Sequence, residues 1–244
     1  MRTITATRYV TPLREGGSMP ALVEADDDGL YVLKFRGAGQ GPRALVAELV
    51  AGELARAIGL PVPEIVLCEL DPRVGVAEPD AEMQELLQKS AGLNVALDFL
   101  PGSLAFTDPD SVDPALAADV VWLDSVVMNV DRSPRNPNLL VWHGSTWLID
   151  HGAAFYRHHR DDTDPEALAT QPFPLIRDHV LLARAGSIAD AAARLAPLVD
   201  EALLARLGAL VPPEWADADA YVRFLRARVA RAAEVAEEAE DARP

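Results

Sequence analysis

The sequence predicts an α+β fold of two lobes: a small β-rich N-terminal lobe and a mainly helical C-terminal lobe with an embedded hairpin. Short β-rich runs fill most of the first third of the chain, helical patterns fill most of the remainder, and one pair of strand-like runs interrupts those helices. The length of 244 residues fits one domain built from two lobes. We expect residues 1–244 to form a single domain, with the smaller lobe at about 1–98 and the larger at about 101–244.

The first lobe is predicted to be strands with two helices. The runs TITATRYV, ALVEA and LYVLKF are typical of strands, and Asp28-Gly29 between the last two is a hairpin signal. GPRALVAELVAGELARAIG is predicted to be a helix, because its apolar residues recur at helical spacing, Pro42 suits a first turn, and Gly59 and Pro61 end the pattern. EIVLCEL is then predicted to be a buried strand, AEMQELLQKSAG a short helix, and LNVALDFLPGS a strand that runs into the connection between lobes.

The second lobe is predicted to begin with the apolar helix DPALAADVVWLDSVVMN. NLLVWHG and TWLIDHG form the embedded hairpin, with His143-Gly144 at its turn, and a polar loop follows. The remainder is helical, and its last helix is expected at about residues 218–237. We expect the ligand site in a cleft between the two lobes.

Composition and charge exclude several classes of function. Half of the residues are apolar, so the chain can bury a core, while a formal net charge of −16 disfavours nucleic acid and anionic membranes as partners. Cys68 is the only cysteine, which excludes an intrachain disulfide and indicates a buried structural thiol. The N-terminus has no apolar run of signal-peptide length, and no segment approaches about 18 uninterrupted apolar residues. We therefore expect a cytoplasmic protein.

The residues that indicate chemistry lie in NVDRSPRNPNLLVWHGSTWLIDHG. Asp131 follows the apolar helix, Asn136 comes five residues later, and Asp150 ends the second hairpin strand. Taken singly, each is more typical of a turn or a cap. Together they supply what phosphoryl transfer needs: one carboxylate to orient the attacking hydroxyl, and a second carboxylate with an amide oxygen to hold Mg²⁺.

This spacing resembles the H-R-D-x-x-x-x-N loop and the following D-F-G of protein kinases, and it is more similar still to the HipA-like kinases and their lipid-kinase relatives. The resemblance implies a protein-kinase-like fold that binds ATP with Mg²⁺. It implies that Asp131 is the catalytic aspartate and that Asn136 and Asp150 bind the metal. It also implies that Lys34, in YVLKF, contacts the α/β-phosphates, with Glu48 of the following helix as its ion-pair partner.

Several of these side chains keep a second interpretation. Glu53 lies on the same predicted helix as Glu48 but about 140° round its axis, so at most one faces the cleft, and we prefer Glu48. Arg132 could bind a phosphate or brace the loop, and the structural role is preferred. Asp124, two turns before the loop, is expected to form local hydrogen bonds.

Two short segments could contact the nucleotide. The first is a glycine-containing turn, as typical of an ordinary turn as of a phosphate-covering loop, formed by Gly16, Gly17 and Ser18. The second could present backbone groups to adenine or could be an ordinary edge strand, and consists of Asp98, Phe99 and Leu100.

The chain departs from the protein-kinase pattern in ways that disfavour ordinary protein-kinase activity. Asn129-Val130 replaces the His-Arg before the aspartate, and His151 replaces the Phe of D-F-G. The sequence predicts an ATP- and Mg²⁺-dependent kinase that phosphorylates a hydroxyl of a protein Ser/Thr or of a small molecule. The alternatives are a nucleotide-binding pseudokinase that regulates a partner and, more weakly, a scaffold whose aspartates only cap turns.

Overall fold

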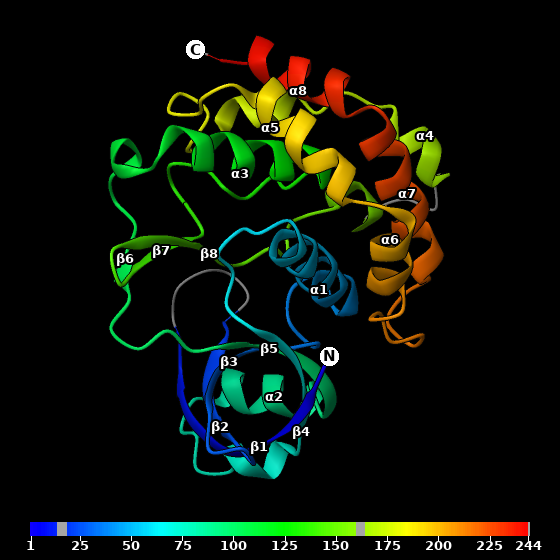
Figure 1. Ribbon diagram of the computed structural model, residues 1–244. Coiled ribbons are helices and arrows are strands. Elements are labelled where there is room, and N and C mark those ends of the chain that lie inside the picture. The colour runs from blue at the N-terminus through cyan, green and yellow to red at the C-terminus, as the bar shows by residue number, and fades with distance from the viewer. Residues whose placement is uncertain (14–18, 160–163, 244) are drawn as a thin grey trace.

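The computed structural model describes residues 1–13, 19–159 and 164–243 (Figure 1). It confirms the predicted α+β fold, with a small β-rich N-terminal lobe below a larger helical lobe. The predicted phosphate-covering turn of Gly16, Gly17 and Ser18 lies outside the described residues.

The small lobe is a closed five-stranded barrel with the strand order β1-β2-β3-β5-β4. Its strands are β1 (Thr3–Pro12), β2 (Ala21–Ala25), β3 (Leu30–Lys34), β4 (Ile65–Leu70) and β5 (Gly92–Asp98). Neighbouring strands are antiparallel except β1 and β4, whose parallel pairing closes the barrel. Alternate residues of each strand point inward, so the barrel has its own small core, which includes Val23, Leu33 and the buried thiol of Cys68.

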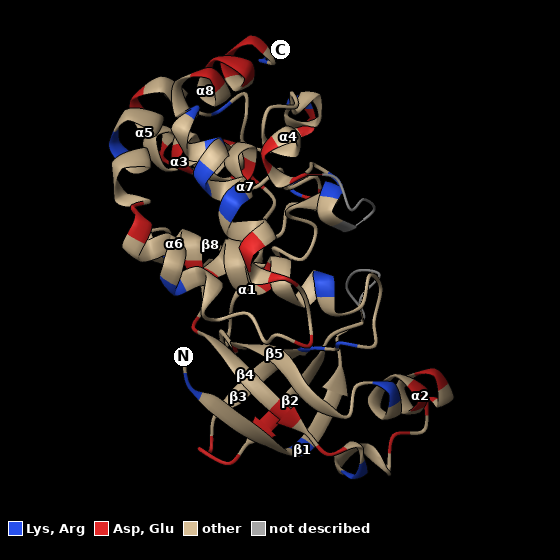
Figure 2. Cartoon of the chain, turned by 90° about the vertical axis from the view of Figure 1, so that its right-hand side faces the viewer, with Lys and Arg blue, Asp and Glu red and all other residues tan. Residues whose placement is uncertain are grey.

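Two helices extend the small lobe. The short 3₁₀ helix η1 (Pro72–Gly75) and the helix α2 (Ala81–Lys89) follow β4, and α2 packs Met83, Leu86 and Leu87 onto the barrel core. Helix α1 (Pro42–Ala57) lies between the barrel and the helical lobe (Figure 1 and Figure 2). The buried side chains of α1 join one continuous core that includes the outer face of β4 and β5 and the helices of the larger lobe.

The helical lobe is built around α3, whose second half is completely buried. Its helices are α3 (Pro114–Val126), α4 (Pro165–Ala169), α5 (Ile188–Leu195), α6 (Glu201–Gly208), α7 (Ala218–Ala230) and α8 (Ala232–Asp241). Short 3₁₀ helices connect them: η2 (Pro109–Ser111), η3 (Tyr156–His159), η4 (Pro174–Asp178) and η5 (Ala196–Leu198). An aspartate side chain caps the N-terminus of α2, α3, α4, α6 and α7, so part of the acidic composition serves helix capping.

A second sheet, of order β6-β7-β8, lies between α3 and the barrel (Figure 1). It consists of β6 (Leu104–Ala105), β7 (Leu139–Trp142) and β8 (Ser145–Leu148), and the last two strands form the predicted hairpin. His143 and Gly144 occupy the turn with φ of 49° and 77°, the left-handed conformation that a tight two-residue hairpin requires.

The prediction of a single C-terminal helix at about residues 218–237 is wrong, because the structure has two helices there, α7 and α8. The chain breaks at Arg231, whose φ of −106° and ψ of 25° are not helical, and α8 continues in a new direction. The reason is packing: α7 lies on α4 and α6, whereas α8 packs Val235, Ala236 and Ala239 against α3 and α5. Among the described residues, no helix is both long and apolar enough to cross a membrane.

Candidate functional site

Lys34, the last residue of β3, lies in the interior with 9% of its surface exposed. Its Nζ is 2.8 Å from Oδ1 of Asp150 and 3.7 Å from Oε2 of Glu48. Burial by itself lowers the pKa of Lys34, but the two carboxylates outweigh burial, so the pKa is raised and the ammonium stays charged. Strand β3, the following helix α1 and the distant segment after β8 therefore bring one cation and two anions together.

Glu48 lies in the middle of α1 and is 1% exposed. Its Oε1 is 3.5 Å from Nδ1 of His151, which is completely buried. Burial alone would raise the pKa of Glu48, but Lys34 and His151 lower it to about 2, so the carboxylate is ionised. Glu53, the alternative on the same helix, points elsewhere and pairs with Arg56 at 3.2 Å.

Asp150 follows β8 with a left-handed backbone, φ 54°. Asn138, which precedes β7, has φ 49°, and the N–H of Ile149 donates to its carbonyl at 3.0 Å. Asn and Asp adopt this conformation more readily than other non-glycine residues. The hairpin thus brings the two segments that carry Asn136 and Asp150 to its open end.

The loop of residues 129–138, which we call the Asp131 loop, holds its polar side chains close together. The amide Nδ2 of Asn136 donates to Oδ2 of Asp131 at 2.8 Å. Asn138 Nδ2 donates to the carbonyl of Asp131 at 2.7 Å and to its Oδ2 at 3.3 Å. No hydrogen bond to Oδ1 of Asp131 is formed within the described chain, so this oxygen is available to an acceptor hydroxyl.

Asn136 and Asp150 supply the types of oxygen that a magnesium ion bound together with a nucleotide takes. Because the Nδ2 group of Asn136 donates to Asp131, its carbonyl oxygen Oδ1 is the atom left to face a cation. Oδ2 of Asp150 is the oxygen not bonded to Lys34. In the described residues, no group of three His, Cys, Asp or Glu side chains forms a metal site. Mg²⁺ needs no such cage, since it is usually held by one or two carboxylates with phosphate oxygens and water.

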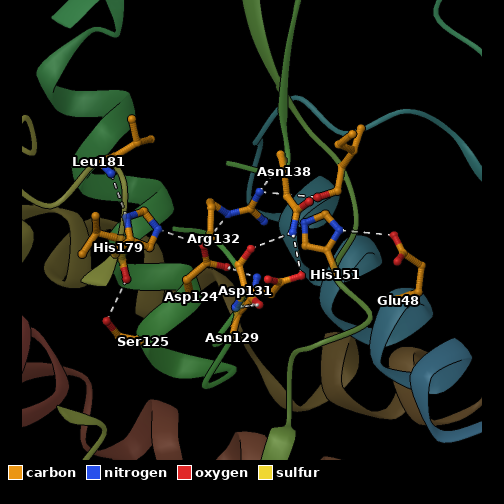
Figure 3. A network of polar contacts seen from close by, with 12 residues as sticks. Glu48, Asp124, Ser125, Asn129, Asp131, Arg132, Asn138, His151, His179 and Leu181 are labelled. Atoms are coloured by element: carbon orange, nitrogen blue, oxygen red, sulfur yellow. Dashed lines mark hydrogen bonds and ion pairs between the residues drawn. The ribbon is translucent and has the colours of Figure 1, made fainter. Parts of the chain in front are cut away.

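Within the loop, Arg132 is 1% exposed and its Nε donates to Oδ2 of Asp124 at 2.5 Å (Figure 3). Arg132 therefore braces the loop, the preferred alternative, and does not face a phosphate. Sequence reasoning missed Asn138 and His179. Asn138 could have been found as a second loop-end amide near Asn136, but His179 lies 55 residues beyond Asp124 and has no local signal.

In the connector between the lobes, the first two backbone N–H groups donate to backbone carbonyls at the ends of barrel strands. The N–H of Asp98 donates to the carbonyl of Glu64 at 2.8 Å, and the N–H of Phe99 donates to that of Leu30 at 3.0 Å. Leu100 is 4% exposed. The carbonyl of Leu100 accepts from the N–H of Ser103 at 3.2 Å.

Comparison with known proteins agrees with this fold. Solved structures with the same fold include the Helicobacter pylori proinflammatory kinase CtkA, at 15% identity and a TM-score of 0.55, covering 91% of this chain and 93% of that one. A Golgi casein kinase with Mn/ADP bound aligns at 15% identity and a TM-score of 0.60, covering 99% of this chain and 74% of that one.

No curated protein matches the sequence. The family model of the HipA-like kinases matches residues 7–233, nearly the whole chain. The chain therefore belongs to the HipA-like kinase family.

Proposed function

We propose that the protein is an ATP- and Mg²⁺-dependent kinase that transfers the γ-phosphoryl group to a hydroxyl of a protein Ser/Thr or of a small molecule. The observation that carries the proposal is the meeting of buried Lys34 with buried Glu48 and partly exposed Asp150, at 3.7 and 2.8 Å. A buried lysine between two carboxylates is a costly arrangement for stability alone. It suits a site where phosphate and a divalent cation bind beside each other.

The role of Asp131 follows from its free oxygen. The acceptor hydroxyl would donate to Oδ1, while Asn136 and Asn138 hold Oδ2 and fix the orientation of the carboxylate. As the new bond forms between the acceptor oxygen and the γ-phosphorus, the bond to the ADP oxygen breaks and the hydroxyl proton passes to Asp131. The products are ADP and the phosphorylated acceptor.

The remaining residues would bind and neutralise the phosphates. Lys34 would contact the α/β-phosphates, with Glu48 holding its ammonium in place. Bound at Asn136 and Asp150, Mg²⁺ would neutralise charge on the phosphate oxygens. Adenine would lie at the connector of Asp98, Phe99 and Leu100.

A second part of the proposal is that the whole chain works as one domain. The continuous core that joins α1, the outer barrel wall and the helical lobe supports this. The boundaries at about residues 98 and 101 then separate lobes of one unit.

The test is transfer of labelled phosphate from [γ-³²P]ATP with Mg²⁺, to the protein itself or to components of a cell lysate. We expect transfer by the wild type and at least a hundredfold less by Asp131→Asn, about the size of an acid–base contribution. Asp110→Asn changes an exposed aspartate of the same lobe and should leave transfer intact. Transfer that survives in Asp131→Asn would contradict the proposed role of Asp131.

The nucleotide-binding pseudokinase is the competing function. It predicts binding without transfer, so thermal stabilisation by ATP with Mg²⁺ in a protein that moves no label would favour it. Ligand at a hundred times its dissociation constant contributes about 2.7 kcal/mol. The absence of any stabilisation would contradict both functions.

A further inference from the structure

A group of buried polar side chains lies beneath the Asp131 loop (Figure 3). Asp124, in the last turn of α3, is completely buried, Arg132 is 1% exposed and His179 is 7% exposed. None of them faces the proposed phosphate site, and His179 comes from a segment of the helical lobe that the proposed chemistry does not use. A buried carboxylate is costly unless it is paired and hydrogen-bonded, so the partners of Asp124 show what it holds in place.

Asp124 accepts hydrogen bonds from three side chains. Its Oδ1 accepts from Nδ2 of Asn129 at 3.1 Å, and its Oδ2 accepts from Nε of Arg132 at 2.5 Å and from Nε2 of His179 at 3.0 Å. Nδ1 of His179 accepts the backbone N–H of Leu181 at 3.0 Å, so its proton must sit on Nε2, the nitrogen that faces Asp124. The charges balance with His179 neutral, because Arg132 offsets Asp124.

Hydrogen bonds connect this group to Asp131 by two routes, one through Asn129 and one through Arg132 and Asn138. Oδ1 of Asn129 accepts the backbone N–H of Asp131 at 3.1 Å. Nη1 of Arg132 donates to the carbonyl of Asn138 at 2.5 Å, and the Asn138 amide contacts the carbonyl and carboxylate of Asp131. The position of Asp131 thus depends on where Asp124 places Asn129 and Arg132.

The segment after η4 is bonded to the same loop through its backbone. The N–H of Val180 donates to the carbonyl of Arg132 at 2.9 Å, next to the His179 side chain that contacts Asp124. Arg132 is therefore held at its side chain by Asp124 and at its backbone by Val180. Leu181 and Leu182 are buried in the main core, which fixes this segment against α3.

We propose that His179 is a positioning residue for Asp131: by donating to Asp124, 55 residues earlier in the chain, and by placing Val180, it sets the geometry of the Asp131 loop. The inference rests on the proposed role of Asp131. It adds a segment of the helical lobe to the residues on which phosphoryl transfer depends.

The experiment compares His179→Leu, which removes the donor, with His179→Gln, which keeps an N–H near the position of Nε2. We expect kcat to fall at least about tenfold in His179→Leu with the KM for ATP little changed, since a displaced reacting group slows the chemical step. His179→Gln should restore kcat to within about threefold of the wild type. Val235→Ala, a buried truncation in α8, is the control for general loss of stability.

Amide hydrogen exchange of the Asp131 loop supplies a second measurement that needs no activity. We expect residues 129–138 to exchange faster in His179→Leu than in the wild type, His179→Gln or Val235→Ala, with the barrel strands unchanged. If His179→Leu and Val235→Ala behave alike in both measurements, His179 has only a general structural role and the inference is overturned. A wild type that transfers no phosphate would defeat the proposed function, while the exchange comparison would still decide whether His179 orders the loop.

Discussion

At the scale of single residues, the charge around Lys34 is unbalanced. One ammonium faces two carboxylates, those of Glu48 and Asp150, so the three groups together carry one excess negative charge. His151, the fourth polar group, is buried against Glu48. This excess negative charge, at a partly exposed carboxylate beside a buried one, favours the binding of a cation, which fits the proposed use of Mg²⁺.

The same imbalance predicts the effect of removing the lysine. Lys34→Met leaves Glu48 buried without its main partner, and we expect the free energy of unfolding to fall by about 3 kcal/mol. Adding Glu48→Gln to Lys34→Met should recover part of the loss. Urea unfolding of the single and double variants measures both effects.

Lys89, the other lysine of the chain, is the matched control. It forms an exposed pair with Glu85 at 2.6 Å, so Lys89→Met should change stability by less than about 1 kcal/mol. If Lys34→Met and Lys89→Met lower the free energy of unfolding equally, Lys34 does not stabilise the buried carboxylate of Glu48.

At the scale of elements, the packing of α1 on β4 determines where Glu48 lies. Gly52, one turn after Glu48, is the point of closest approach: a Cβ added there would come within 2.4 Å of Cδ1 of Ile65. The missing side chain lets α1 lie directly on the strand, so Glu48 reaches Lys34. A glycine inside a helix is otherwise unfavourable by roughly 0.5–1 kcal/mol relative to alanine.

Gly52→Ala should therefore destabilise the protein despite the better helix propensity of alanine, by about 1 kcal/mol net. Ile65→Val removes the atom in the way and costs about 0.5–1.5 kcal/mol alone. The double variant should be more stable than the sum of the two single changes implies, which a double-mutant cycle measures. Strict additivity would mean that α1 and β4 do not meet at this point.

At the scale of the whole molecule, the buried groups beneath the Asp131 loop make stability depend on pH. Burial lowers the pKa of His179, although its bond to Asp124 opposes the shift. Burial alone would raise the pKa of Asp124, but Arg132 and His179 outweigh it and hold that pKa well below its usual range. In the folded protein, both groups therefore resist protonation.

The sign of the effect follows from proton uptake on unfolding. Below about pH 6.5 an unfolded histidine binds a proton that folded His179 does not, so the free energy of unfolding falls as the pH drops. We expect a loss between pH 7 and 5 with a slope of at most about 1.4 kcal/mol per unit. A steeper loss follows below about pH 4, where Asp124 takes up a proton in the unfolded chain but not in the folded protein. Urea unfolding at a series of pH values across this range measures how the free energy of unfolding changes.

Two histidine variants separate this effect from the general response of an acidic chain. His179→Gln should flatten the slope between pH 7 and 5 and leave the loss below pH 4. His143→Gln, at the exposed hairpin turn, should leave the whole profile unchanged. An unchanged slope in His179→Gln would show that this histidine does not couple proton binding to folding.

Sequence predicted the parts of this molecule that depend on local pattern. The strands, the apolar helix before the loop and the hairpin follow from periodicity and turn residues, and Asp131, Asn136 and Asp150 could be named because their spacing resembles a known motif. His179 could not, since its contact with Asp124 exists only after η4 packs beneath the loop. The break at Arg231 was missed for the same reason. It lets α8 pack on α3 and α5, and this tertiary contact leaves no trace in the local helical pattern.

The parallel pairing of β1 with β4 has a consequence for synthesis on the ribosome. Thr3, Ile4 and Thr5 align with Leu67, Cys68 and Glu69. More than sixty further residues must therefore be synthesised after β1 before β4, its second neighbour in the barrel, emerges. Until then its free edge is an open template for other nascent chains. The barrel that presents Lys34 is thus completed late, and its earliest strand is the one most exposed to misassembly.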